Sequence, residues 1–119
     1  VLIMATMFQK IHEQSVFAAQ NAAKAEDEKW GERFGMCGFA WVTAHPVNKG
    51  NTRLGKEERA ILESIGFEKD WTGKTYQIWN PSGYSTQNID VKEAGADAYV
   101  SMMNKLGSGI RLTTGSRLD

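Results

Sequence analysis

CGFAWVTAHP, residues 37–46, is the most apolar stretch of the chain and the one that decides its fold. Alternation along an extended strand sends Phe39 and Trp41 to one face and Ala40 and Val42 to the other. Both faces of this strand are therefore apolar, so each face needs a covering element or a bound partner. What covers the aromatic face is the question on which the function depends.

A long helix is predicted before this strand. Residues 5–30 contain neither glycine nor proline and are rich in alanine, and Gly31 follows them. Small and apolar side chains recur every three or four residues, which is typical of one narrow stripe on an amphipathic helix. We therefore assign 1–35 to an N-terminal helix. Its stripe comprises Phe8, Ile11, Ser15, Ala18, Ala19 and Ala22.

The chain after the strand shows the patterns of a helix, a hairpin, a second helix and a last strand. The complete order is strand, helix, strand, strand, helix, strand, which is the ferredoxin-like βαββαβ pattern of an antiparallel sheet with two helices on one face. The predicted fold class is α+β, with this core at 36–119 and the whole chain forming one compact domain. The expected segments are helices at 56–65 and 91–106, a hairpin at 67–80 and a strand at 110–114.

In a ferredoxin-like sheet the first and third strands are neighbours at the centre. This arrangement puts Trp79 next to Trp41 on the face that also carries Phe39. The N-terminal helix or a second copy of the chain is the first expected cover, because large apolar patches rarely stay bare. The alternatives are a nucleic acid whose bases stack on the rings, as in RNA-recognition modules, and a small apolar ligand or another protein. The segment GKTYQIW, 73–79, does not match the pattern K/R-G-F/Y-G/A-F-V-x-F/Y of those modules.

Composition limits the class of protein. The 119 residues include 14 basic and 14 acidic side chains, so the chain lacks the basic excess usual in proteins that bind mainly through phosphate contacts. The single cysteine, Cys37, excludes an internal disulfide and a cysteine-based zinc site, and it fits a reducing compartment. No apolar run approaches the ~20 residues that span a bilayer, and the opening VLIMATM lacks the pattern of a signal peptide. We expect a cytoplasmic protein without membrane association.

Catalytic and metal-binding patterns are missing from the sequence. His12 and His45 fall on different elements without a second ligand at a metal-binding spacing, and His12 is expected on the exposed side of its helix. There is no G-x-S-x-G, P-loop or H-E-x-x-H motif, and a cysteine at the start of a buried strand is usually a core residue. We expect no catalytic residue, no metal and no cofactor.

Two polar segments have alternative interpretations. The loop VNKGNTRLG, 47–55, either stays solvated or binds an anion through its cations near a helix N-terminus. Asp90 and Glu93 are typical of a helix N-cap and its reciprocal partner three residues later. An enzyme or sensor for a small anionic ligand would use a larger set of polar residues. These residues do not belong to a common sequence motif. This set comprises Lys49, Arg53, Gln87, Asp90 and Arg117.

Several ordered motifs resemble a set of uncharacterised small proteins encoded by tailed bacteriophages and prophages. The resemblance covers about 36–119 and implies a phage origin and a host-cytoplasmic location, without an assigned activity. The matching segments are CGFAWV at 37–42, ILESIGF at 61–67, WNPSG at 79–83, QNIDVKEAG at 87–95 and SRLD at 116–119.

These observations lead to three hypotheses of function. The preferred one is a small phage protein that acts by binding without catalysis, as a dimer and on a host or phage protein, for example as a host-takeover or counter-defence (anti-CRISPR-like) factor. The second is a single-stranded nucleic-acid-binding module that uses Phe39, Trp41 and Trp79. The third is the enzyme or sensor for a small anionic ligand. The candidate binding residues are Phe39, Trp41, Trp79, Lys49, Arg53, Gln87 and Arg117.

Overall fold

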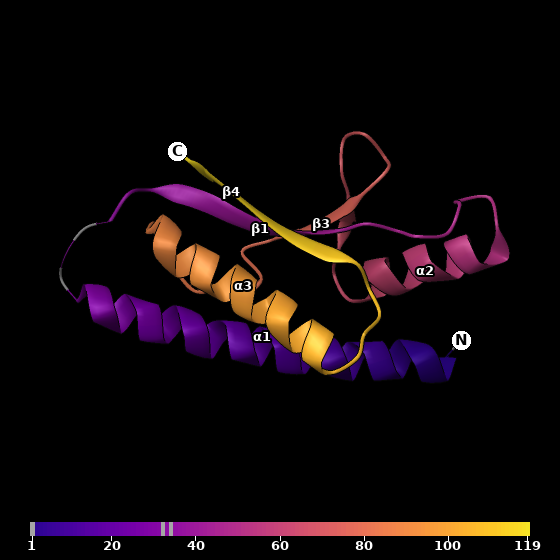
Figure 1. Cartoon of the computed structure of the whole chain (residues 1–119), viewed down its shortest axis with the longest axis horizontal. Helices are drawn as coiled ribbons and strands as arrows, with labels where there is room; N and C mark the ends of the chain where they lie inside the picture. The colour runs from indigo at the N-terminus through magenta and orange to yellow at the C-terminus, as the bar shows by residue number, and fades with distance from the viewer. Residues whose placement is uncertain (1, 32, 34) are drawn as a thin grey trace.

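The computed structural model describes residues 2–31, 33 and 35–119. In these ranges the chain forms a four-stranded sheet and three helices, and α3 lies between the sheet and α1 (Figure 1). The α+β class and the long N-terminal helix are therefore confirmed. The elements are α1 (Leu2–Trp30), β1 (Gly38–Ala44), α2 (Arg53–Ser64), β2 (Glu68–Lys69), β3 (Tyr76–Trp79), α3 (Ile89–Lys105) and β4 (Leu112–Leu118).

The sheet has the strand order β2-β3-β1-β4, and every neighbouring pair is antiparallel. As predicted, β1 and β3 lie side by side at the centre, with Trp41 opposite Trp79. β4 pairs with all seven residues of β1, so it continues to Leu118, beyond the predicted end at 114. The strand extends this far because β1 offers a backbone partner along its whole length. β2 has only two residues, which reflects its polar sequence.

The inner face of the sheet packs on α3. Ala40, Val42 and Ala44 are buried on this face, and their small side chains let the helix approach β1 closely. Tyr99 and Met103 of α3 are fully buried against them. The remaining members of this core come from every layer. They are Phe8, Ile11, Ala19, Leu62, Ile65, Phe67, Tyr76 and Ala96.

The N-terminal helix packs on α3 and not on the aromatic face, so the expectation that it covers Phe39, Trp41 and Trp79 is wrong. Ala19 and Ala23 are fully buried where α1 meets α3. Gly95 of α3 lies beside α1: a Cβ atom built on it would be in ordinary contact with the Ala19 carbonyl oxygen, at 3.5 Å, and closer to the Ser82 side chain, at 3.1 Å.

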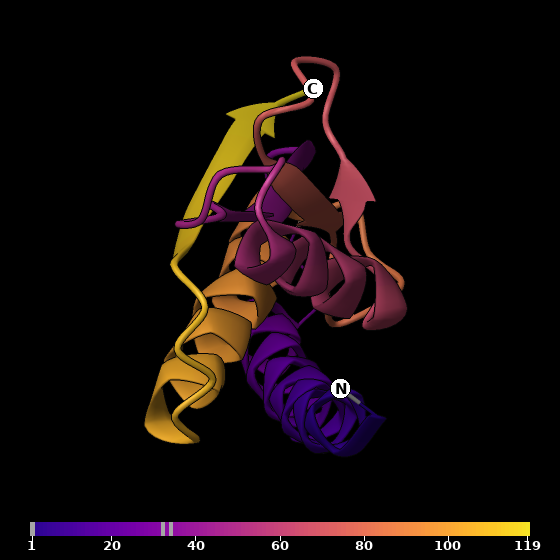
Figure 2. The same ribbon diagram turned by 90° about the vertical axis from the view of Figure 1, so that its right-hand side faces the viewer.

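The predicted stripe of α1 is largely confirmed by burial. Phe8, Ile11, Ser15 and Ala19 are buried, whereas Ala18 and Ala22 are only partly buried. Ala23 takes the place expected for Ala22, because the buried stripe follows the line along which α1 crosses α3. Figure 2 shows α1 on the opposite side of the molecule from the outer surface of the sheet.

A polar pair joins the two packed helices. The Nδ1 atom of His12 lies 2.7 Å from the Tyr99 hydroxyl oxygen, and His12 is half-buried. The prediction that His12 lies on the exposed side of its helix is therefore wrong. Burial lowers the pKa of His12 and raises the pKa of Tyr99, because each charged form loses hydration there. This pair satisfies polar atoms that would otherwise be costly to bury.

Helix α3 begins at Ile89, two residues before the predicted start, and its N-cap is Asn88. The Asn88 side-chain oxygen accepts a hydrogen bond from the Asp90 backbone N–H at 2.9 Å. The prediction that Asp90 is the cap is therefore wrong. The cap lies two residues earlier because the Ile89 N–H donates to the Met36 carbonyl oxygen, which holds the backbone just ahead of β1.

Replacement of Asn88 by alanine should lower the free energy of unfolding by about 0.5–2 kcal/mol, through loss of the cap. Asp90→Ala is the matched control, because its exposed carboxylate contributes only through the helix dipole, about 0.3–1 kcal/mol. Urea unfolding of both variants measures the difference. A larger loss in Asp90→Ala than in Asn88→Ala would contradict this assignment.

Candidate functional site

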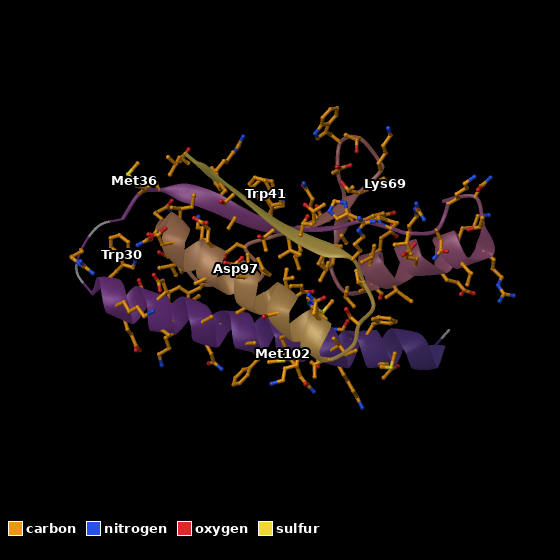
Figure 3. The ribbon with its side chains drawn as sticks, in the orientation of Figure 1. Trp30, Met36, Trp41, Lys69, Asp97 and Met102 are labelled. Atoms are coloured by element: carbon orange, nitrogen blue, oxygen red, sulfur yellow. The ribbon has the colours of Figure 1, made fainter. Side chains whose placement is uncertain are left out.

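Three aromatic rings lie together on the outer surface of the sheet, and we call this surface the aromatic face. Trp41 and Trp79 have ring centroids 4.8 Å apart with planes inclined by 34°, and Phe39 meets Trp79 edge-on at 6.1 Å. Figure 3 shows Trp41 on the side of the sheet away from α1 and α3. Trp79 is 49% exposed, and Phe39 and Trp41 are half-buried. The aromatic face is therefore a preformed apolar surface that remains open to solvent.

The position of Trp41 depends on a glycine in the neighbouring strand. Gly115 pairs with Trp41, and a Cβ atom built on it would come within 2.7 Å of the indole ring. This distance is below the ~3.5 Å contact of two carbon atoms, so only glycine admits the ring there. Sequence reasoning missed Gly115, because its role appears only once the register between β1 and β4 is known.

Two cations approach the Phe39 ring. Arg117 lies opposite Phe39 in the register, with its Cζ atom 5.5 Å from the ring centroid. Lys92 reaches the same ring from α3, with its Nζ atom 5.2 Å from the centroid, and donates a hydrogen bond to the Gly38 carbonyl oxygen at 2.8 Å. Both geometries are those of cation–π contacts. Lys92 was not predicted, because the apolar stripe of a helix does not indicate that a lysine beside it will contact a residue of a strand.

The rest of the aromatic face is polar and carries little negative charge. Thr43 pairs with Gln77 and with Thr113, and Gln77 pairs with Glu68, so these four side chains cross the sheet as one row. Among the described strand residues of this face, Glu68 has the only carboxylate. Arg117 therefore places one exposed cation beside the rings, in a chain whose total charge is neutral.

The loop between β2 and β3 carries an exposed tryptophan on a turn that is closed by hydrogen bonds. Trp71 is 96% exposed. The Asp70 carboxylate accepts hydrogen bonds from the backbone N–H groups of Thr72 and Gly73 and from the hydroxyls of Thr72 and Thr75. The hydroxyl bonds of Thr72 and Thr75 are the main reason that the pKa of Asp70 falls to about 2. The loop stands on the side of the sheet away from α1 (Figures 1 and 2).

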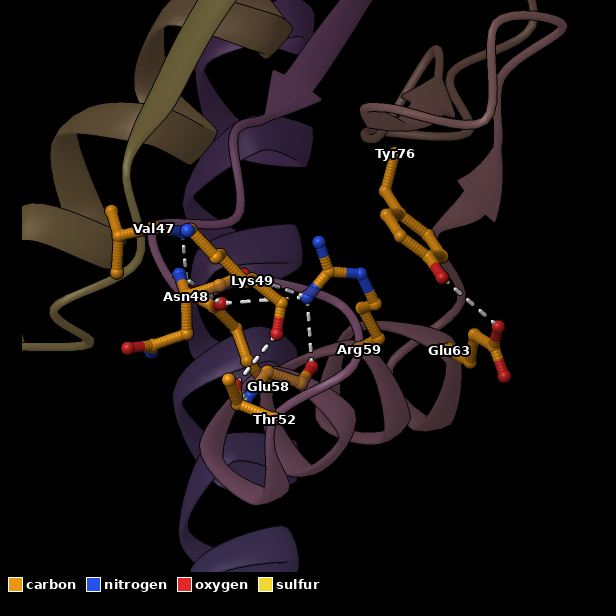
Figure 4. A network of polar contacts seen from close by, with 9 residues as sticks. Val47, Asn48, Lys49, Thr52, Glu58, Arg59, Glu63 and Tyr76 are labelled. Atoms are coloured by element: carbon orange, nitrogen blue, oxygen red, sulfur yellow. Dashed lines mark hydrogen bonds and ion pairs between the residues drawn. The ribbon is translucent and has the colours of Figure 1, made fainter.

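The cationic loop before α2 is stabilised by groups of its own (Figure 4). The Glu58 carboxylate accepts from the backbone N–H groups of Val47 and Asn48 at 3.0 and 3.1 Å. The Arg59 guanidinium donates to the Asn48 carbonyl oxygen, and the Thr52 hydroxyl accepts from the Gly55 N–H as the N-cap of α2. These backbone donors, which an anion would use, therefore already have partners inside the protein.

The structure divides the predicted binding residues into two groups and leaves Gln87 apart from both. Phe39, Trp41, Trp79 and Arg117 gather on the aromatic face. Gln87 is exposed near the start of β1, where its carbonyl oxygen accepts from the Gly38 N–H. The second group lies at the start of α2, beyond the other end of β1, and its binding of an anion stays a prediction. It comprises Lys49, which is exposed, and Arg53, which lies 3.7 Å from Glu57.

Comparisons with protein-family models, curated proteins and solved structures find no match to this chain. Within the described ranges, no three His, Cys, Asp or Glu side chains gather closely enough to hold a metal ion. No helix in the same ranges is long and apolar enough to cross a membrane. The geometry of the aromatic face is therefore the feature that best indicates a function.

Gly115→Ala should displace the Trp41 indole from Trp79 while leaving the fold intact, because the new methyl group occupies the place of the ring. We expect a changed near-UV circular dichroism spectrum, which reports fixed aromatic packing, with an unchanged far-UV spectrum. Ser116→Ala is the matched control, since Ser116 is exposed and pairs with Ala40 on the other face. Identical near-UV spectra for Gly115→Ala and the unmodified protein would disprove the contact.

Proposed function

We propose that this protein binds single-stranded nucleic acid on its aromatic face, without catalysing a reaction. The observation that carries the proposal is the pair Trp41 and Trp79, which lie side by side on the two central strands and are open to solvent. Bases stack on such rings whatever their sequence, and each stacked base contributes about 1–3 kcal/mol.

The topology of the sheet supports this proposal. The order β2-β3-β1-β4 with antiparallel neighbours agrees with the ferredoxin-like core that the sequence predicts, and we propose that class for residues 36–119. RNA-recognition modules stack two or three bases on the aromatic residues of a four-stranded sheet. The central position of Trp41 and Trp79 corresponds to that use, although the sequence lacks the module's usual motif.

The local charge also supports an anionic partner. Arg117 is exposed beside the Phe39 ring, and Glu68 lies two rows away across the sheet. Lys92 approaches the same ring from α3 but is buried, with its Nζ atom bonded to the Gly38 carbonyl oxygen. One exposed cation releases few counterions, so the logarithm of affinity should fall with the logarithm of salt concentration with a slope of only about −0.7. Stacking would then provide most of the binding free energy, which is compatible with a neutral chain.

Binding of labelled oligo-dT and oligo-U, followed by fluorescence anisotropy, tests this function. Trp79→Ala and Trp41→Ala should each weaken binding by about 5- to 150-fold, which corresponds to the loss of one stacked base. Met7→Ala is the matched control, because this exposed apolar side chain belongs to α1, which lies on the far side of the molecule. A duplex of the same length should bind less tightly than the single strand.

Thermal unfolding of the same variants separates lost binding from lost folding. Trp79 is half exposed, so its replacement should cost much less than the ~3–5 kcal/mol expected for a buried ring such as Phe67. The proposal fails if the unmodified protein does not bind either oligonucleotide at low salt. It also fails if the folded tryptophan variants bind with unchanged affinity.

A protein partner is the second candidate, and a different surface favours it. Phe17 is 64% exposed on α1 and, with Met102 of α3, lines a shallow hollow on the opposite side of the molecule. Exposed apolar side chains at a hollow are typical of protein-binding surfaces. A second copy of this chain is the occupant we propose there, and the resemblance to phage proteins supports a host or phage protein as a further partner.

Light scattering at high micromolar concentration measures this assembly. We expect twice the chain mass of 13.2 kDa, and Phe17→Glu should return the protein to the monomer, because it brings a carboxylate into the contact. Gln20→Glu, at an exposed position one turn along α1, controls for the added charge. A monomer mass for the unmodified protein would contradict the dimer and leave the nucleic-acid proposal unchanged.

A further inference from the structure

Trp71 has no structural role that its contacts explain. Its side chain is 96% exposed, whereas Trp41 and Trp79 are partly buried against each other. A large indole at the tip of a turn leaves apolar area in water and contributes nothing to the core. Such a side chain is typical of a contact residue, because tryptophan is enriched among the residues that dominate binding.

The turn that carries Trp71 is organised before any partner arrives. Four hydrogen bonds to the Asp70 carboxylate close the turn, and Gly73 supplies the left-handed backbone conformation, with φ of 75°. The low pKa of Asp70 keeps this carboxylate ionised throughout the neutral range. A turn held by internal hydrogen bonds reduces the cost of ordering the backbone on binding.

The position of the turn relates Trp71 to the aromatic face. Both views show the β2–β3 loop on the side of the sheet that faces away from α1 (Figures 1 and 2). Thr75, where the loop rejoins β3, lies four residues from Trp79, a distance of roughly 13 Å along an extended strand. Gln77 lies between them on the same face and offers an amide that can donate and accept hydrogen bonds.

We propose that Trp71 is a second stacking position for the same single strand, reached only by oligonucleotides long enough to extend along β3 from Trp79. This inference rests on the proposed nucleic-acid function. Lys74 is exposed at the end of the turn and would lie near the strand's phosphates, whereas Lys69 pairs with Tyr76 on the other face of the sheet. The internal donors that hold the Asp70 carboxylate direct it into the turn, away from an anionic ligand.

A length series of oligo-dT tests the proposal, with binding followed by quenching of tryptophan fluorescence. The shortest probe is a dinucleotide, which covers the Trp41–Trp79 pair, and the longest is a ten-nucleotide strand. Trp71→Ala should leave the dinucleotide affinity unchanged and weaken the ten-nucleotide strand by about 5- to 150-fold, the loss of one stacked base. Trp79→Ala should weaken both probes. Trp71→Phe should restore most of the affinity for the long strand, because it keeps an aromatic face.

Two further variants separate stacking from turn geometry and charge. Asp70→Ala opens the turn but keeps the indole, so it should weaken the long strand less than Trp71→Ala does. Lys74→Gln should reduce the salt dependence for the long strand only. If Trp71→Ala matches the unmodified protein at every length while Trp79→Ala binds weakly, the second position is disproved and the nucleic-acid function stands. If the unmodified protein binds no oligonucleotide of any length, both proposals fail.

Discussion

The close packing of α1 on α3 through small side chains is the constraint on which the rest of the molecule depends. Ala19 and Ala23 bring the two helices together beside Gly95, and larger side chains at this crossing would separate them. Because α1 packs against α3, helix α3 separates α1 from the sheet. The outer surface of the sheet is consequently left without a covering element of its own chain.

The two faces of β1 have different roles. One face packs in the core and the other carries the aromatic residues of the candidate site. Ala40, Val42 and Ala44 hold the sheet on α3, and these residues carry no chemistry beyond packing. Phe39 and Trp41, alternating with them, are placed outward by the same backbone. A one-residue change of register would exchange the two sets, so the buried face also determines the position of the aromatic face. The register of β1 therefore determines both the packing of the core and the exposure of the aromatic rings.

Much of the fold could be predicted from the sequence, because its patterns are local. The alternation in residues 38–44 predicts β1, and the order of elements predicts that Trp41 and Trp79 are neighbours. The docking of α1 could not be predicted, since a stripe of alanines indicates close packing without naming its partner. Asn88 and Asp90 are both good caps, and only the bond from Ile89 to Met36 selects between them.

The candidate site was predicted in its aromatic part and missed in its supporting part. Phe39, Trp41, Trp79 and Arg117 come together as expected from strand pairing. Gly115 and Lys92 were missed because each acts on a residue distant in sequence, through a register or a long side chain. Lys49 and Arg53 lie elsewhere, since charge in a loop does not indicate which face the loop will reach.

The pairing of β1 with β4 also determines the order in which the protein can form. β1 leaves the ribosome well before its partner along all seven residues, because that partner is the last strand of the sheet. Until β4 has been synthesised, the most apolar strand has one open edge, and Trp41 lacks the glycine against which it rests. Contacts between segments so distant in sequence form slowly, and a nascent apolar edge is prone to mispairing. β1 therefore keeps at least one open edge until β4 has been synthesised, and a chaperone that protects the nascent chain would have to shield β1 until then.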